Sequence, residues 1–362
     1  MTESVTDKQY MRLALRLARK GAGMVSPNPL VGAVMVRDGK ILGTGYHQYF
    51  GGPHAEINAI KDAGGDVSGA TLYCTLEPCS HAGKKTPPCA QRLVKEKIGR
   101  AVIAVLDPNP RVNGNGVRIL KEAGIDVQTG LLGAACRELN RFFHKYITTD
   151  LPYVMVKMAQ TLDGFIARER QQQSWITNSA VRRRVHKWRS EYDTVLIGAG
   201  TLKSDNPQLN VREVKGRNPR RIVLDRDLDA DPGANIFNNA QSGKIILFCG
   251  KHAKTDKIHS IINTGAEVIR MDVDGTGRLA LRPILRELHN RGIASVLVEG
   301  GQKIFTSFLS DDLADEIRIF IAPVLWGSGL KAVSDKINLD SFRLAHSDKL
   351  ADNLLLTFLR KD

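Results

Sequence analysis

Three short segments in the first half of the chain carry side chains that can bind a metal ion together. They are His54-Ala55-Glu56, Glu77-Pro78-Cys79 and Thr86-Pro87-Pro88-Cys89. One imidazole and two thiolates leave a fourth tetrahedral position open on zinc, as a catalytic zinc site requires. Zinc in such a site lowers the pKa of a bound water molecule towards neutrality. The pattern therefore predicts a hydrolytic zinc site with His54, Cys79 and Cys89 as the metal ligands.

Glu56 follows the ligand histidine by two residues, so its carboxylate can lie beside the activated water without binding the metal. From there it can move protons between the water, a ring nitrogen and a leaving amine. His-x-Glu followed by Pro-Cys and a further Cys is typical of zinc-dependent nucleobase deaminases. We also expect His54 and Cys79 to begin helices, because the positive end of the helix dipole favours a thiolate. The remaining cysteines, Cys74, Cys136 and Cys249, are interpreted as core residues.

The elements that must position these side chains alternate between helix and strand. Helical periodicity is found in residues 10–20, 55–63, 89–97 and 117–123. Strand-like runs cover residues 30–36, 40–46, 70–76 and 101–106, with a further short run around Val127. Asp38-Gly39 between the first two runs indicates a hairpin turn. This alternation predicts a layered α/β domain over residues 1–146.

A second α/β pattern starts near Leu151 and defines a second domain over residues 147–362. Strands are expected at 153–158, 194–197, 221–224, 244–248, 267–271, 294–298, 316–321 and 354–359. Helices are expected at 178–189, 279–291 and 304–309. The boundary falls in a short connection near residues 141–150.

Two turns of small residues follow apolar strands in this second domain. They are Gly198-Ala199-Gly200-Thr201 and Glu299-Gly300-Gly301. Such turns let backbone amides approach a phosphate, although neither matches the Gly-x-Gly-x-x-Gly fingerprint of the Rossmann fold. Each turn alone is also explained by simple chain reversal. As a pair they predict a dinucleotide cradle.

Composition excludes several protein classes but leaves the basic charge open. The chain has 362 residues, five cysteines and a formal net charge of +14, divided as +8 and +6 between the two expected domains. The apolar content of 42% excludes a mainly disordered chain. We see no secretory signal and no transmembrane stretch, and the sparse cysteines fit a reducing cytoplasm. The positive charge fits either nucleic acid or small phosphorylated ligands.

The motifs of the first half resemble the deaminase half of the bifunctional riboflavin-biosynthesis deaminase/reductase. The matching segments are 75–81, 86–89, 28–32 and 107–110. That family separates its cysteine ligands by eight residues, whereas nine lie between Cys79 and Cys89 here, with the extra residue near Lys84 and Lys85. The resemblance implies a cytidine-deaminase-like three-layer α/β domain. It also implies a substrate pocket that is lined by Asn28, His47, Ser80, His81, Asp107 and Asn109.

The second half resembles the reductase half of the same family, which has a dihydrofolate-reductase-like α/β fold and uses NADPH. The matching segments include 156–157, 161–164, 175–177, 205–207 and 298–301. The resemblance implies NADPH contacts from Ala159, Trp175, Thr177, Thr201, Asp205 and the stretch from Gly301. It implies substrate contacts from Arg189, Leu209, Arg212 and Glu299. Lys157 is expected as a buried cation at the substrate. Gln173 replaces a serine that contacts substrate in the family.

Taken together, the resemblance implies two successive reactions. Zinc-dependent deamination of 2,5-diamino-6-ribosylamino-4(3H)-pyrimidinone 5′-phosphate would precede reduction of 5-amino-6-(5-phosphoribosylamino)uracil by NADPH. The partners would be small phosphorylated pyrimidines rather than nucleic acid or membrane, and the chain would form a homo-oligomer, either a dimer or a tetramer. One alternative is an RNA or tRNA base deaminase with an accessory domain. Another is a nucleic-acid-binding protein with a structural zinc, although such sites usually have four protein ligands.

Overall fold

The computed structural model describes residues 5–80, 88–110, 112–168, 176–238, 244–334 and 337–361. The chain forms two compact units, Met1–Asp150 and Leu151–Asp362. The segment at residues 141–150, which was expected to be a short connection, lies within the first unit and is largely a helix, α6 (Arg141–Thr148). Apolar residues recur at helical spacing within it as Phe142, Phe143, Tyr146 and Ile147. This amphipathic pattern explains why the segment is not an open linker.

The first unit is built on a five-stranded sheet in the order β2-β1-β3-β4-β5. Its strands are β1 (Gly32–Arg37), β2 (Lys40–Tyr46), β3 (Thr71–Cys74), β4 (Arg100–Ile103) and β5 (Asp126–Thr129). The predicted hairpin is confirmed, with β1 and β2 antiparallel across Asp38 and Gly39, which both have positive φ. β3, β4 and β5 are parallel to one another.

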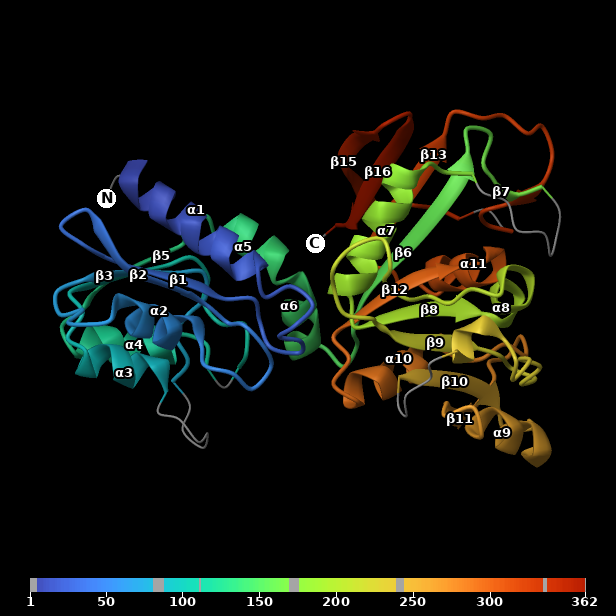
Figure 1. Cartoon of the computed structure of the whole chain (residues 1–362), viewed down its shortest axis with the longest axis horizontal. Coiled ribbons are helices and arrows are strands. Elements are labelled where there is room, and N and C mark those ends of the chain that lie inside the picture. Colours follow the sequence, from blue (N-terminus) through green and yellow to red (C-terminus); the bar gives the residue numbers. More distant parts are fainter. Residues whose placement is uncertain are drawn as a thin grey trace. The chain divides into compact units, whose positions relative to one another are not determined.

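Helices cover both faces of this sheet and complete the three layers. They are α1 (Val5–Arg19), α2 (Ala55–Ala63), α3 (Cys89–Lys95), α4 (Asn115–Glu122) and α5 (Gly133–Leu139). α1 and α5 lie on one face, and α2, α3 and α4 lie on the other (Figure 1). α2 packs very close to β2, since a Cβ atom at Gly45 would lie 2.2 Å from the carbonyl oxygen of Ala55. Glycine in the strand therefore sets the position of the first turn of α2, which carries Glu56.

The second unit contains a nine-stranded sheet in the order β11-β10-β9-β8-β12-β6-β13-β16-β15. Its strands are β6 (Tyr153–Thr161), β8 (Thr194–Gly198), β9 (Arg220–Leu224), β10 (Ile245–Gly250), β11 (Glu267–Met271), β12 (Ser295–Gly300), β13 (Glu316–Ala322), β15 (Phe342–Leu350) and β16 (Asn353–Arg360). The strands from β11 to β13 are parallel, and β16 is antiparallel to both neighbours. Two short strands, β7 (Phe165–Ala167) and β14 (Leu330–Lys331), form a separate ribbon.

Helices α10 (Leu281–Asn290) and α11 (Gln302–Ser310) pack against one face of this sheet through a core that includes Leu285 and Phe305. α7 (Ser179–Glu191) lies on the other face, where Trp188 stacks on Phe320 of β13 at 5.3 Å. The remaining helical segments are α8 (Ala199–Asp205), α9 (Thr255–Ile262) and a 3-10 turn at Asn235–Phe237. Periodicity alone did not predict α8, α9, β7, β14 or β15, which are short or largely exposed and carry a weak apolar pattern.

Candidate active sites

The three predicted metal ligands meet where α2 and α3 begin, beyond the carboxyl end of the central strand β3. His54 is the residue that caps the N-terminus of α2, and Cys89 is the first residue of α3. The Nδ1 atom of His54 lies 3.4 Å from Sγ of Cys79 and 3.3 Å from Sγ of Cys89. One ligand atom from each residue lies within 4.8 Å of the others. This set of one nitrogen and two sulfurs fits zinc and leaves a fourth position for a non-protein ligand.

The prediction that Cys79 begins a helix is wrong. Cys79 lies in an irregular segment after β3, and the helix that faces it begins at Cys89. The backbone N–H of Cys89 donates a hydrogen bond to Sγ of Cys79 at 3.3 Å. The N-terminus of α3 therefore stabilises the Cys79 sulfur through its first backbone amide, although Cys79 is not part of that helix.

The electrostatics of this cluster favour a thiolate on Cys79. Hydrogen bonds from the Cys89 thiol, from His54 and from the Cys89 amide lower the pKa of Cys79 to about 4. Glu56, which is only 3% exposed, lies in the first turn of α2. Burial raises the pKa of its carboxyl group to about 7, against the opposing charge of His54.

Glu77 has a structural task that the sequence did not reveal. Its buried carboxylate accepts four backbone hydrogen bonds, from Asp107 at 3.0 Å, Gly114 at 3.0 Å, Gly116 at 2.8 Å and Val117 at 3.2 Å. It thereby ties the metal-binding segment to the loop that follows β4. In the sequence, the glycine-rich start of α4 could have indicated this contact, because the first backbone amides of a helix need a hydrogen-bond acceptor.

The predicted substrate residues of the first unit form two groups around the metal cluster. Nε2 of His47 lies 3.3 Å from Nδ2 of Asn28, Nδ1 lies 3.1 Å from the carbonyl oxygen of Pro53, and the His47 ring packs edge-on against His54 at 5.6 Å. In the other group, Asp107 accepts the backbone N–H of Asn109 at 2.9 Å and is itself held by Glu77. Ser80 follows Cys79 and is half-buried. His81, Lys84 and Lys85 lie outside the described residues.

The two small-residue turns of the second unit come together at the carboxyl ends of two adjacent central strands. β8 and β12 are adjacent parallel strands, and α8 and α11 begin directly after them at Gly198 and Gly301. A Cβ atom at Gly301, where φ is +80°, would lie 2.8 Å from the hydroxyl oxygen of Thr201. Because β8 leads to β9 on one side and β12 leads to β13 on the other, the carboxyl ends of these two strands form a topological switch point, where open α/β sheets bind ligands. The arrangement fits a dinucleotide.

The other predicted NADPH contacts are more scattered. Asp205 ends α8, and burial raises the pKa of its carboxyl group. Ala159 lies near the carboxyl end of β6, next to β12 in the sheet. Thr177 precedes α7 and forms no hydrogen bond with either turn within the described residues. Trp175 and Gln173 lie outside the part of the chain that the structure describes.

The predicted substrate residues of the second unit gather around an ion pair. Nε and Nη2 of Arg189 donate to the two carboxylate oxygens of Glu299 at 2.6 and 2.8 Å, and the two side chains are 12% and 7% exposed. Burial would raise the pKa of Glu299, but Arg189 and then Lys157 outweigh it and hold that pKa below its ordinary value. Burial lowers the pKa of Lys157, against the opposing charge of Glu299. The two residues directly follow Val156 and Val298, which pair between β6 and β12.

Leu209 and Arg212 lie in the irregular segment between α8 and β9, beside this ion pair. Nη1 of Arg189 donates to the carbonyl oxygen of Asn210 at 3.3 Å. The backbone N–H of Arg212 donates to Nδ1 of His186 at 3.1 Å. His186 is a site residue that the sequence did not reveal, because a lone histidine on a basic helix carries no distinctive signal.

Comparisons with known proteins agree with this division of the chain. Residues 4–105 match the family model for the cytidine and deoxycytidylate deaminase zinc-binding region, and residues 152–356 match the model of the RibD C-terminal domain. The riboflavin biosynthesis protein RibD of Aquifex aeolicus is 40% identical over 362 residues, which covers 98% of each chain. This chain belongs to the RibD family.

Solved RibD structures have the same fold over nearly the whole length. RibD of Acinetobacter baumannii superimposes with a TM-score of 0.88 at 34% identity, covering 99% of both chains. A Thermotoga maritima protein superimposes with a TM-score of 0.86 at 39% identity, covering 98% of this chain and 99% of that one. That protein is named a diaminohydroxyphosphoribosylaminopyrimidine deaminase/5-amino-6-(5-phosphoribosylamino)uracil reductase. The expected RibD fold, a cytidine-deaminase-like domain followed by a reductase domain, is confirmed.

The family assignment also decides between the functional alternatives. A RibD relationship over 98% of the chain favours the riboflavin enzyme over an RNA base deaminase with an accessory domain. Among the described residues, no helix is long and apolar enough to cross a membrane.

Proposed function

We propose that this chain performs two successive reactions of riboflavin biosynthesis, with deamination in residues 1–146 and reduction in residues 147–362. RibD proteins are bifunctional deaminases and reductases that use zinc and NADPH. The observation that carries the proposal is the cluster of His54, Cys79 and Cys89 beside the buried Glu56, on a chain that also has the paired glycine turns. The substrates are then small phosphorylated pyrimidines.

In the first unit, His54, Cys79 and Cys89 would hold zinc. The chemistry that zinc supplies when bound there is Lewis acidity, which makes a water molecule a better nucleophile near neutral pH. Glu56 is the catalytic proton carrier: it accepts a proton from the attacking water and delivers protons to the ring nitrogen and the leaving amine. A carbon–oxygen bond forms at C2 of the pyrimidinone, the exocyclic carbon–nitrogen bond breaks, and ammonia leaves.

Two groups of polar side chains would orient the pyrimidine. Asn28 and His47 lie on the side of the metal cluster where His47 packs on His54, and Asp107 and Asn109 lie on the side tied to Glu77. Amide, imidazole and carboxylate groups match the donors and acceptors of a pyrimidine edge. Ser80 and His81 would complete the pocket as the residues that directly follow Cys79.

In the second unit, the glycine turns would receive the pyrophosphate of NADPH, with Thr201 and Gly301 at the closest approach. Ala159, Trp175, Thr177 and Asp205 are the further proposed cofactor contacts. NADPH supplies a hydride when bound. Reduction of the ribosyl group, most simply in its ring-opened imine form, would place a hydride on the anomeric carbon and a proton from solvent on the imine nitrogen, and would give a ribitylamino product.

The substrate of this second reaction would lie over Lys157, Leu209, Arg212 and the Arg189–Glu299 pair. Two N–H groups of Arg189 already donate hydrogen bonds to Glu299. Arg212, in contrast, is exposed and forms no ion pair with a carboxylate among the described residues. Arg212 is therefore the better candidate for the substrate phosphate, which its planar guanidinium matches. The Arg189–Glu299 pair and Lys157 would face the sugar.

We further propose that the chain acts in the cytoplasm as a homo-oligomer, either a dimer or a tetramer. The low cysteine content, with all five cysteines free, fits a reducing compartment. Light scattering coupled to size-exclusion chromatography measures the oligomeric state.

The proposed function is tested by product analysis. The zinc-loaded protein is incubated with 2,5-diamino-6-ribosylamino-4(3H)-pyrimidinone 5′-phosphate, with and without NADPH, and the products are identified by mass spectrometry. We expect the deaminated uracil without NADPH and the ribitylamino compound with it. Absence of the deaminated product would reject the first assignment, and its accumulation in the presence of NADPH would reject the second.

A further inference from the structure

The segment between α8 and β9 is held in place by side chains rather than by secondary structure. Residues 206–212 form neither helix nor strand. Leu209 is 3% exposed and has a φ of +52°, a left-handed conformation that costs a leucine free energy. Such a conformation persists only where the surroundings over-determine it, so the contacts that hold the segment matter for its function.

Three consecutive residues after Leu209 each have a backbone group bound by a different side chain. The carbonyl oxygen of Asn210 accepts from Arg189 at 3.3 Å. The N–H of Val211 donates to Oδ1 of Asn218 at 2.7 Å, and the N–H of Arg212 donates to Nδ1 of His186 at 3.1 Å. The contacts from Arg189 and His186 both come from α7. They connect the segment to a helix that packs on the sheet through Trp188.

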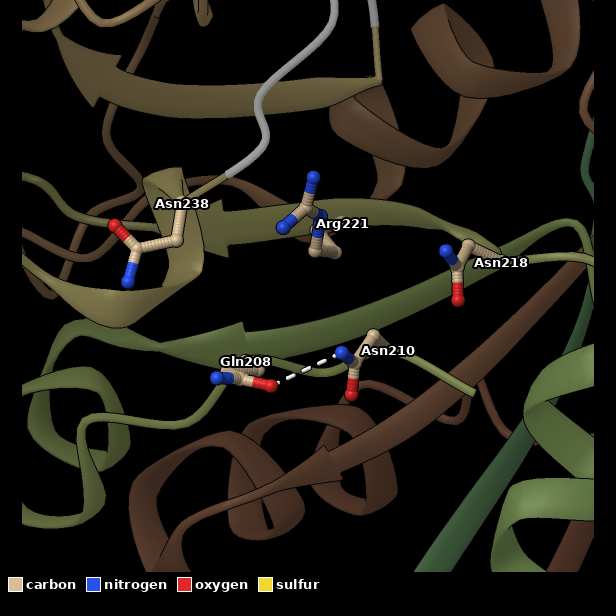
Figure 2. Close-up of a pocket in the computed structure, with 5 residues that line it drawn as sticks. All are labelled: Gln208, Asn210, Asn218, Arg221 and Asn238. Carbon is tan, nitrogen blue, oxygen red and sulfur yellow. Dashed lines mark hydrogen bonds between the residues drawn. The ribbon is translucent and has the colours of Figure 1, made fainter. Parts of the chain in front are cut away.

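Side chains of the same segment also bind one another around a small polar pocket. Nδ2 of Asn210 donates to Oε1 of Gln208 at 3.0 Å, and Nη1 of Arg212 donates to Oδ1 of Asn210 at 2.8 Å. Figure 2 shows Gln208 and Asn210 on one side of this pocket, with Asn218, Arg221 and Asn238 around it. These local bonds give the segment its shape but do not fix its place over the substrate residues. Arg189 and His186 tie its end at Asn210 and Arg212 to α7, whereas Asn235 binds its beginning at Asn206.

His186 is suited to this task because it stays neutral. A ring nitrogen accepts a hydrogen bond only when it carries no proton, so the contact with the Arg212 amide requires the tautomer that is protonated on Nε2. His186 is 3% exposed. Burial and the charges of Arg189 and Arg212 lower its pKa to about 4, against the opposing effect of Glu213 and Glu299. The acceptor is thus present throughout the neutral range of pH.

We propose that His186 is a positioning residue of the reductase site: it binds the backbone amide of Arg212 and holds the segment from Leu209 to Arg212 so that Arg212 meets the phosphate of the reductase substrate. The inference rests on the proposed function, which places Arg212 at that phosphate. His186 itself contacts neither substrate nor cofactor in this role.

The test compares two substitutions in the full-length protein. His186→Leu removes the acceptor, whereas His186→Asn retains an oxygen near the position of Nδ1. We expect His186→Leu to raise the reductase KM for 5-amino-6-(5-phosphoribosylamino)uracil about tenfold, in line with a donor left without its partner. The KM for NADPH and the deaminase activity should not change. His186→Asn should restore most of the substrate affinity. Arg212→Ala, which removes the guanidinium itself, sets the upper limit of the effect.

Hydrogen exchange of the Arg212 amide gives a second readout that is independent of catalysis. The amide should be protected in the wild type and in His186→Asn, and should exchange faster in His186→Leu. If His186→Leu does not fold, His186→Phe provides a ring without an acceptor. An unchanged substrate KM and unchanged exchange in the apolar variant would overturn the inference while wild-type turnover still supports the proposed function. Wild-type protein that does not reduce the substrate would instead reject the proposed function.

Discussion

The two candidate sites contain buried glutamates whose environments act in opposite directions. Glu56 in the first unit has no arginine or lysine partner among the described residues, and burial raises its pKa to about 7. Glu299 in the second unit is buried as well, but the bidentate contact with Arg189 and the charge of Lys157 hold its pKa below the ordinary value. In the proposed function, the same side chain thus serves as a proton carrier in one site and as a permanent anion in the other. The neighbours decide between these roles.

The two sites also differ in how they are assembled. The metal cluster is built from two helix N-termini and one irregular segment within 36 residues, from His54 to Cys89. The reductase site collects side chains from β6, α7, β12 and the segment before β9, which span more than 140 residues. If the two sites are independent, a change that inactivates one site leaves the activity of the other unchanged. The loss of activity should be larger where the reaction depends on a single group.

The largest expected effect is that of metal removal. Treatment with a chelator such as dipicolinic acid should abolish deamination, because no side chain of the cluster replaces the Lewis acid. Reduction of 5-amino-6-(5-phosphoribosylamino)uracil by NADPH should persist. Both rates are measured on one chelated sample, and added zinc should restore the first. Parallel loss of both activities would show that the two sites are not independent.

Glu56→Gln should lower the deamination rate about 10³-fold, because a glutamine cannot carry the proton. Zinc content, measured by atomic absorption, should stay at one ion per chain, and reductase activity should be unchanged. Glu77→Gln is the matched control, since it alters another buried glutamate of the same unit, one that accepts hydrogen bonds from backbone amides instead. Its main effect should be a lower melting temperature. Loss of zinc from Glu56→Gln would assign Glu56 to metal binding.

Glu299→Gln should lower the reductase kcat/KM about 100-fold and leave deamination intact. The substitution leaves the Arg189 guanidinium buried without a counter-charge, which costs about 3 kcal/mol or more in buried ion pairs. Calorimetric unfolding measures that loss. Arg217→Gln is a control at a different ion pair of the same unit, 3.0 Å from Asp193, and should spare catalysis. Equal losses of activity in the two variants would indicate a general effect on folding.

The smallest expected effect is the pH dependence of stability that His186 causes. Its pKa of about 4 in the folded state lies below its ordinary value of 6.5, so the unfolded chain binds the proton more readily. Stability should therefore fall as the pH decreases from 6.5 to 4 and level off below that. The difference in unfolding free energy between the wild type and His186→Asn isolates this contribution from those of Glu213 and Glu299. A difference that stays constant over this range would contradict the assigned neutral state.

The sequence predicted much of the architecture because the local patterns are strong. The hairpin at Asp38-Gly39, the helix at 55–63 and the positions of most strands of the second unit follow from turn chemistry and apolar periodicity. The helix at Arg141–Thr148 was not predicted, because residues 141–150 were interpreted as the boundary between two domains despite their amphipathic pattern. α8 was interpreted only as a turn, because its seven residues are too few for periodicity to be recognised.

The sequence by itself determined the chemistry of the metal cluster, since the types and order of His54, Glu56, Cys79 and Cys89 already specify a zinc-dependent deaminase. It did not determine what supports that cluster or how the second site is arranged. The contacts of Glu77 with four amides and of His186 with the Arg212 amide join residues 26 to 40 positions apart. The Arg189–Glu299 pair spans 110 positions. Only the tertiary structure decides such contacts, because burial and proximity, which set the pKa values and the hydrogen-bond partners, arise when distant segments pack together.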